Sequence, residues 1–108
     1  MPTYSNNSYA VKNVSTSGST AISSIASGTV AVSSLILANT GTSPITVSAY
    51  ITRSSVNYYL VYVATVPVGG SLEAIQGNRV VLKASDSLSV VSSTATSCDC
   101  WVSALTAT

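Results

Sequence analysis

The chain has 108 residues and a net charge of +1, and only seven side chains are charged: four Lys or Arg and three Asp or Glu, with no His. A domain of this size normally carries charge at about a quarter of its positions. This composition argues against acid–base catalysis and metal binding, and it gives no electrostatic footprint for nucleic acid or an anionic membrane. We therefore expect no enzymatic activity, no cofactor and no metal, nucleic-acid or membrane partner.

The polar and apolar residues both favour β-strands. Ser and Thr supply about a third of the positions, and six Tyr occur without any Phe. β-Branched residues and Tyr suit a pleated, half-buried surface. The positive mean hydropathy of +0.47 argues against disorder. The N-terminus resembles no signal peptide, and the longest apolar run is too short to span a bilayer, so we expect a protein made in the cytoplasm with reduced thiols.

The chain order predicts an arm followed by a single domain. Residues 1–8 are polar and predict a flexible N-terminal arm or an edge segment, and the β-sandwich domain is expected over residues 9–108. Strands are expected at 9–14, 21–28, 29–38, 45–52, 58–66, 71–75, 79–83, 87–93 and 98–105. A spacing of about ten residues is typical of an antiparallel sandwich. We expect an all-β fold of about eight strands, either jelly-roll or immunoglobulin-like.

Four of these segments carry more specific expectations. Residues 45–52 alternate between apolar and polar, which predicts a strand with one buried face. Residues 58–66 are apolar at both parities, which predicts a central strand covered on both sides. Residues 71–75 and 79–83 flank the turn 76–78 and predict a β-hairpin.

Cys98 and Cys100 are the first candidate site. Two positions apart on a strand, both sulfurs share a face. A closed zinc site needs four ligands, and the chain has no other Cys and no His. The favoured interpretation is a pair of reduced, packed thiols, with an intersubunit disulfide or an intersubunit metal site as alternatives.

Turn residues form a second group of candidates. Asp86 lies between two predicted strands, where its carboxylate is expected to accept hydrogen bonds from nearby backbone N–H groups, and a catalytic or calcium-binding role is the alternative. Structural turns are expected at Asn39, Gly41, Pro44, Gly69, Gly70 and Asp86.

Tyrosines form a third group. On a regular strand Tyr58 and Tyr62 share one face and Tyr59 takes the other. Core or interface packing is the favoured interpretation, and a sugar-binding face that uses Tyr58, Tyr62 and Trp101 is the competing one.

Several segments together resemble a known family. They are 35–51 with its turn at Asn39, 58–63, 66–73 with Pro-Val-Gly-Gly-Ser-Leu, and 80–88 with Asp86 followed by Ser and Leu. This arrangement is similar to small virion-associated proteins of tailed bacteriophages, over roughly residues 30–107. In that family a Gly usually stands where this chain has Ser85. The shared motifs are turn motifs, and no catalytic residue is carried over.

The resemblance implies a structural part of a phage particle in the virion. The leading hypothesis is a capsid decoration (cement) protein that binds the major capsid protein or other virion proteins and also itself, as a homo-oligomer such as a trimer. The alternatives are a neck, tail or fibre-attachment component, or a carbohydrate- or receptor-binding module. Candidate subunit or capsid contacts are Thr3, Tyr4, Tyr9, Tyr50, Tyr58 and Tyr62.

Overall fold

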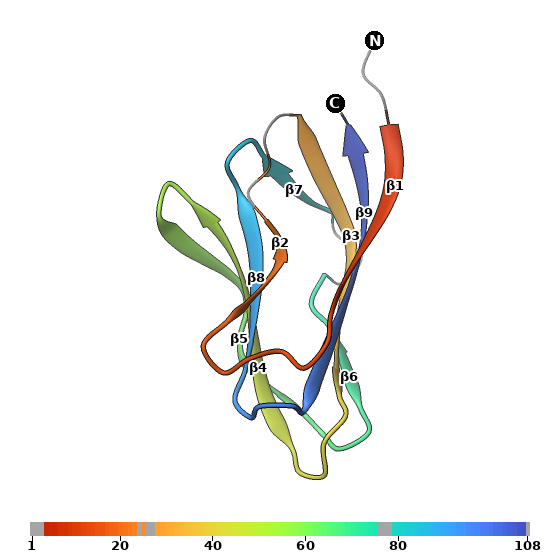
Figure 1. The fold of residues 1–108 in the computed structure, drawn as a ribbon, viewed down its shortest axis with the longest axis vertical. Coiled ribbons are helices and arrows are strands. Elements are labelled where there is room, and N and C mark those ends of the chain that lie inside the picture. Colours follow the sequence, from red (N-terminus) through yellow and green to blue (C-terminus); the bar gives the residue numbers. More distant parts are fainter. Residues whose placement is uncertain (1–3, 24, 26–27, 76–78, 108) are drawn as a thin grey trace.

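The computed structural model describes residues 4–23, 25, 28–75 and 79–107. These residues form nine strands in two antiparallel sheets that face each other (Figure 1). The strands are β1 (Tyr4–Val11), β2 (Ser19–Ile22), β3 (Thr29–Asn39), β4 (Ile45–Arg53), β5 (Val56–Val66), β6 (Ser71–Glu73), β7 (Val80–Lys83), β8 (Ser87–Ser92) and β9 (Cys98–Ala107). No helix of the described residues is long and apolar enough to cross a membrane.

The strand pairs identify the sandwich as a jelly roll. β1 pairs with β9, β2 with β8, β3 with β6 and β7, and β4 with β5, as in a long hairpin rolled up on itself. Sheet A has the order β1-β9-β3 with β6 and β7 beyond β3, and sheet B has the order β2-β8-β4-β5. The predicted β-sandwich is confirmed, and of its two expected types the pairing is that of a jelly roll.

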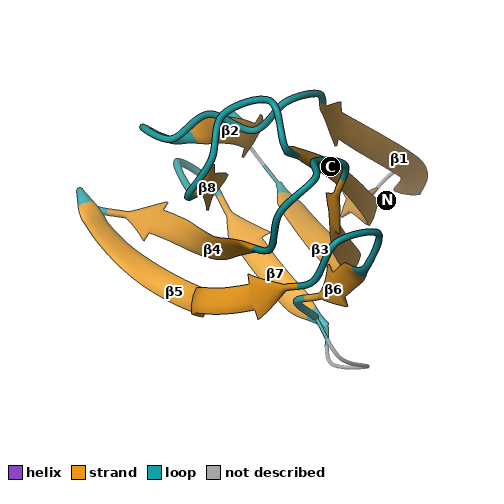
Figure 2. Cartoon of the chain, turned by 90° about the horizontal axis from the view of Figure 1, so that it is seen from below, coloured by secondary structure: helices purple, strands orange, loops and turns teal. Residues whose placement is uncertain are grey.

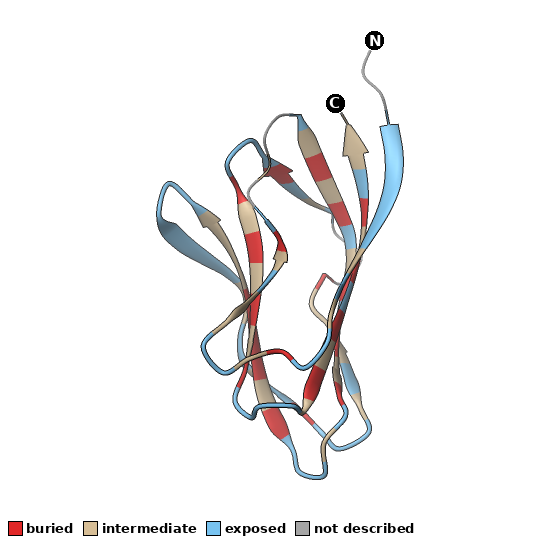
Figure 3. Cartoon of the chain, in the orientation of Figure 1, coloured by how far each residue is buried: buried red, intermediate tan, exposed pale blue. Residues whose placement is uncertain are grey.

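The core lies between the two sheets and follows the period of two in the sequence. Buried and less buried positions alternate along β8, and in β9 they alternate from Cys98 to Leu105 (Figure 3). The largest fully buried side chains are aliphatic and come from both sheets: Leu35, Leu37, Leu82, Leu88, Val47, Val90 and Val102. Alternation of this kind places one face of each strand in the core and the other outside.

The predicted central strand at 58–66 is wrong. β5 lies at the edge of sheet B, and β4 is its one partner among the described strands (Figure 2). Its side chains are exposed at both parities, including Tyr58, Tyr59, Tyr62 and Val63. A strand with apolar residues on both faces has the same sequence pattern whether neighbours cover it or not, so the pattern could not distinguish the two cases.

The hairpin expected from 71–75 and 79–83 is also wrong. β6 and β7 both pair antiparallel with β3, β6 at Ile36–Ala38 and β7 at Thr29–Val32. Two strands antiparallel to the same strand run in the same direction, so they follow one another along the edge of sheet A. The expected turn at 76–78 lies outside the described residues.

Residues 1–8 were expected to form either a flexible arm or an edge segment, and from Tyr4 onward they form an edge strand. β1 runs through residue 8 without a break and pairs with β9 from Tyr4 opposite Ala107 to Val11 opposite Cys100. Tyr4 to Ser8 are all exposed. Sheet A therefore ends in a strand whose far side pairs with nothing in the chain's described residues.

The turn between β7 and β8 makes a testable prediction. Ser85 is exposed with φ +74°, a conformation that costs an L-residue about 1–2 kcal/mol and Gly almost nothing. We expect Ser85→Gly to raise the free energy of unfolding by about 0.5–1 kcal/mol, after the greater chain entropy of Gly is subtracted. Urea unfolding measures the change, and Ser87→Gly, at the first residue of β8 and paired with Thr52 of β4, should lower stability. A destabilised Ser85→Gly variant would show that the turn is not strained.

Candidate interaction surfaces

Each of the three carboxylates of the chain is used within the fold. Glu73 accepts hydrogen bonds from the Ser34 hydroxyl (2.9 Å) and the Leu35 N–H (3.0 Å), beside the irregular register of β3 with β9. Asp99 accepts from Lys12 Nζ (2.9 Å) and the Asn13 N–H (3.1 Å). Both hydrogen bonds lower the pKa of Asp99, and the one from the Asn13 N–H has the larger effect.

Asp86 is the most buried of the three acids, with its side chain 2% exposed. Arg53 Nε donates to Oδ1 at 2.9 Å, its NH2 group donates to Oδ2, and the Lys83 N–H donates to Oδ2 at 2.8 Å. The hydrogen bond from Arg53 is the main reason why the pKa of Asp86 is lowered, against the effect of burial. This contact joins the end of β4 in sheet B to the β7–β8 turn. Asp86 therefore stabilises the fold by holding these two segments together.

Metal ligands do not gather anywhere in the described part of the chain, since no group of three or more Cys, Asp or Glu side chains is close enough to hold an ion. Cys98 and Cys100 are both buried and unbonded, and both point into the core from β9. Burial raises the pKa of Cys98 to about 11 and that of Cys100 to about 12. This is the environment of the reduced, packed thiols favoured by the sequence.

The buried thiols predict low reactivity in the folded protein. At pH 8, roughly one Cys98 thiol in a thousand is a thiolate, and fewer for Cys100, because their pKa values are about 11 and 12. We expect labelling by an aromatic disulfide reagent to be more than a hundredfold slower in buffer than in 6 M guanidinium. Rapid labelling of either thiol without denaturant would contradict this burial.

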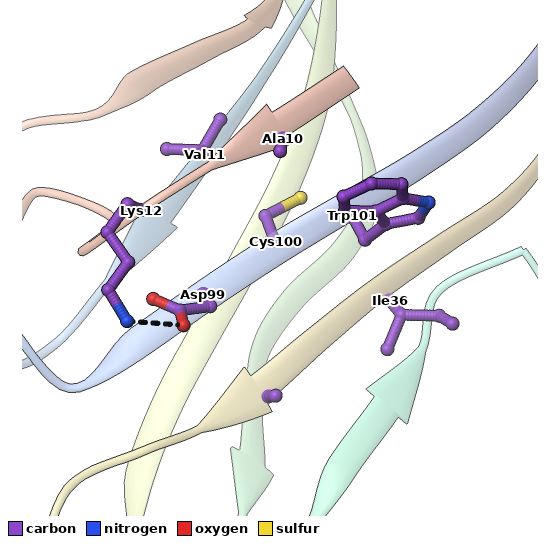
Figure 4. Close-up of a pocket in the computed structure, with 8 residues that line it drawn as sticks. Ala10, Val11, Lys12, Ile36, Asp99, Cys100 and Trp101 are labelled. Carbon is purple, nitrogen blue, oxygen red and sulfur yellow. Dashed lines mark hydrogen bonds and ion pairs between the residues drawn. The ribbon is translucent and has the colours of Figure 1, made fainter. Parts of the chain in front are cut away.

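An apolar patch lies on the outer face of sheet A, and we call it the Trp101 face: Ala10, Ile36, Ala38 and Trp101. In register, Ala10 and Ile36 lie on either side of Trp101, and Ala38 lies opposite Asp99. Trp101 is 52% exposed. These side chains line a shallow depression of about 210 Å³, with the Lys12–Asp99 ion pair at its rim (Figure 4).

A tyrosine cluster (Tyr50, Tyr59 and Tyr62) lies on the outer side of sheet B. The ring centroids of Tyr50 and Tyr59 are 5.1 Å apart, and those of Tyr59 and Tyr62 are 4.9 Å apart and nearly perpendicular. The expectation that Tyr58 and Tyr62 share a face is wrong. The pairing of β5 with β4 shifts on each side of Val61, and the extra residue between Tyr59 and Val61 reverses the alternation there, so that Tyr62 lies on the same side as Tyr59.

Tyr58 lies elsewhere, in a groove between the sheets. Together with Ile51, Arg53 and Val81 it lines a volume of about 330 Å³ beside the Arg53–Asp86 contact. Trp101 belongs to sheet A and Tyr62 to sheet B. The sugar-binding face suggested for Tyr58, Tyr62 and Trp101 is therefore divided among three surfaces.

The other expected contacts are scattered as well. Tyr4 is exposed on β1. Tyr9 is half-buried and packs against the core, and Tyr50 is half-buried within the tyrosine cluster. Thr3 lies outside the described residues. The structure brings together Tyr50 and Tyr62 from the expected set and adds Tyr59.

The expected turn residues lie at three connections between the sheets: β3–β4, β5–β6 and, for Asp86, β7–β8. Asn39 is buried. Its Nδ2 donates hydrogen bonds to Ser43 O (2.9 Å) and Val66 O (3.1 Å), and its Oδ1 accepts one from the Gly41 N–H (2.9 Å). A Cβ on Gly41 would lie 2.6 Å from Ser97 Oγ.

Between β5 and β6, the Gly70 N–H donates to Pro67 O (3.0 Å) across Gly69, whose φ of +73° favours glycine. A Cβ on Gly70 would lie 2.9 Å from Pro67 Cγ. Pro44, exposed, precedes the first residue of β4.

Sequence reasoning missed the partners of the acids and the Trp101 face. Arg53 and Asp86 are 33 positions apart, and no local pattern links them. The Trp101 face was detectable in part, because Trp101 alternates with Cys100 and Val102, but its neighbours Ala10 and Ile36 come from two other strands.

No protein-family model matches the chain, and no curated protein matches it in sequence. Several solved structures match its architecture, among them two with TM-scores above 0.5. One is from Bacillus endospore appendages, described as a novel family of disulfide-linked pili, with a TM-score of 0.58 and 14% identity over 100% of this chain and 90% of that chain. The other is the VP2 subviral particle of infectious bursal disease virus, with a TM-score of 0.53 and 12% identity over 98% of this chain and 32% of that chain. At these identities the likeness establishes a shared fold.

Proposed function

We propose that this chain is a non-enzymatic structural protein of a virus particle, and specifically a decoration protein that binds and stabilises a bacteriophage head shell. One observation carries the proposal. Aromatic and aliphatic side chains are exposed on the outer faces of both sheets of a nearly uncharged sandwich, while all three carboxylates are used within the fold. Such surfaces mark sites of protein–protein interaction.

The composition suits repeated contacts for a physical reason. Removing a charge from water costs several kcal/mol unless it finds a good partner. Ser and Thr hydroxyls need only a hydrogen-bond partner, and they lose less side-chain entropy than Lys or Glu when they are ordered. A surface of Ser, Thr, Tyr and aliphatic residues therefore packs against a shell, or against further copies, at low desolvation cost.

Two pieces of context support a virion role. The motifs of residues 35–88 resemble small phage virion proteins, and the jelly roll is a fold that viral capsid proteins use. The partners in this proposal are the major capsid protein and other copies of the chain. The most exposed candidates for contact are Tyr62 (71% exposed), Tyr4, Tyr58 and Trp101.

A second candidate is the subunit of a pilus-like filament. It is favoured by the match to the Bacillus appendage chain, which spans nearly all of both chains. A disulfide link through Cys98 or Cys100 is not part of this candidate, because both thiols are buried in the core. The two candidates differ in what the purified chain does alone: a filament subunit polymerises, and a decoration protein requires a shell.

Co-sedimentation with shells assembled without the chain tests the proposal. We expect saturable binding, weakened at least tenfold by Trp101→Ser if the Trp101 face meets the shell, or by Tyr62→Ser if the tyrosine cluster does, because exposed aromatic residues dominate such interfaces. The control is Val68→Ser, which changes an apolar residue in the β5–β6 turn that is as exposed as Trp101. Absence of binding, together with filament formation by the protein alone, would replace the decoration role by the filament role.

A further inference from the structure

We propose that two copies of this chain pair antiparallel through their β1 strands, so that sheet A continues from one subunit into the next. The inference rests on the proposed function, because it names a second copy as the partner at one defined surface. β1 lies at the border of sheet A, and β9 is its one partner among the described strands (Figures 1 and 2). Its first five residues, Tyr4 to Ser8, are exposed.

β1 lacks the features that keep sheet edges from pairing. Proteins protect edges with charges, Pro, bulges or very short strands. Among the described edges, β2 has four residues and an irregular register, and β5 contains two register shifts. β6 and β7 have three and four residues and include Glu73 and Lys83. β1 has eight residues, a continuous register with β9, and no charge or Pro.

The same comparison selects the partner. A strand that pairs along β1 must be continuous over a similar length, because each bulge leaves backbone groups unpaired. Of the edge strands that the structure describes, β1 alone meets this condition, so its best complement within the chain is the β1 of a second copy. Two copies bring no like charges together, and Asn and Ser side chains both donate and accept hydrogen bonds across the pair.

Two-fold symmetry and the length of the overlap together leave two registers for the pair. Antiparallel neighbours in a sheet are related by a two-fold axis perpendicular to it, and residues directly opposite share a face. One residue of β1 therefore faces its own copy. The longest overlaps place either Asn7 there, with Tyr4 opposite Ala10, or Ser8 there, with Ser5 opposite Val11. Both choices bring the two Trp101 faces onto the same side of one continuous sheet.

The size of the contact predicts how it behaves. Seven paired residues span about 23 Å, and a sheet with its side chains is about 10 Å thick, which gives roughly 230 Å² per copy. A stable interface buries about 800 Å² per partner. The pair is therefore weak between free molecules and becomes firm when a shell holds both copies close together.

Site-directed cross-linking tests the pair in the full chain. We expect Asn7→Cys or Ser8→Cys to give a covalent dimer with a short bis-maleimide at high protein concentration. The native thiols do not compete because both are buried. Ser71→Cys, exposed on β6 at the opposite edge of sheet A, is the matched control and should stay monomeric. Absence of dimer at both axis positions, or equal dimer at residue 71, would overturn the proposal.

A charge at the axis provides a second readout. In the Asn7→Cys background, Ser8→Lys should reduce the yield of dimer at least tenfold at low salt, because it brings two ammonium groups together, and Ser71→Lys should not change it. An unchanged yield with Ser8→Lys would also contradict pairing through β1. Shell binding is measured separately: a chain that binds shells but gives no β1 dimer disproves only the pairing, and a chain that dimerises but binds no shell disproves only the proposed function.

Discussion

Replacing Asn39 with Ala is expected to lower the free energy of unfolding by about 3 kcal/mol. The Asn39 side chain is one of the few buried polar groups, 4% exposed, and its amide joins three segments. Nδ2 donates to Ser43 O and Val66 O, and Oδ1 accepts the Gly41 N–H. Alanine leaves these backbone groups without their partner, at about 1 kcal/mol or more for each buried group.

Chemical denaturation of matched variants measures this loss. Asn57→Ala removes an amide that is exposed and accepts one hydrogen bond from Thr52, so it should cost about 0.5 kcal/mol or less. Asn39→Asp keeps the acceptor for Gly41 but turns a carboxylate oxygen toward two carbonyls, so at pH 7 it should destabilise at least as much as Asn39→Ala. A loss below 1 kcal/mol for Asn39→Ala would show that the amide does not hold this connection.

Replacing Asp86 with Ala is expected to lower stability by about 3 kcal/mol at pH 7, because charged hydrogen bonds to Arg53 and to the Lys83 N–H are lost at a buried site. The pKa of Asp86 is lowered in the fold from its ordinary value of 3.8, mainly by Arg53. Its contribution is therefore complete above about pH 5 and is lost as the pH falls through the lowered folded value.

Unfolding curves from pH 7 to pH 3 check both parts of this expectation. Wild-type stability should fall more steeply toward acid than that of Asp86→Asn, and Asp99, whose pKa is also lowered, contributes equally to both proteins. Arg53→Met removes the main cause of the lowered pKa of Asp86 and leaves burial, which raises that pKa, opposed by the Lys83 N–H and the Lys83 charge, which lower it. The stability of Arg53→Met should therefore fall less steeply toward acid than that of wild type. Parallel pH profiles for wild type and Asp86→Asn would contradict the role of this carboxylate.

Local patterns predicted strands but not their neighbours. Alternation along 45–52 and 87–93 located β4 and β8, because a period of two follows directly from strand geometry. The place of a strand within its sheet depends on pairing between distant segments. This is why β5 was expected at the centre and lies at the edge, and why β6 and β7 were expected as a hairpin and instead share β3.

The candidate surfaces also divide into features that a local sequence pattern predicts and features that depend on pairing between distant strands. Turn chemistry indicated Asn39, Gly69 and Asp86, since the conformations of turns are set by the residues in them. The tyrosine cluster depends on the irregular register between β4 and β5, which no local pattern marks. The Trp101 face depends on three strands meeting side by side, so its composition follows from topology.

Imaging of shells mixed with the purified chain tests the central claim most directly. Shells assembled without the chain are incubated with it to saturation, and the bound density is averaged over the particle. A decoration role predicts density repeated at every equivalent position of the head lattice, with hundreds of copies per particle and one of the two outer faces against the shell. Density restricted to a vertex or the tail, at a dozen copies or fewer, would contradict that role and assign the chain to the neck or tail.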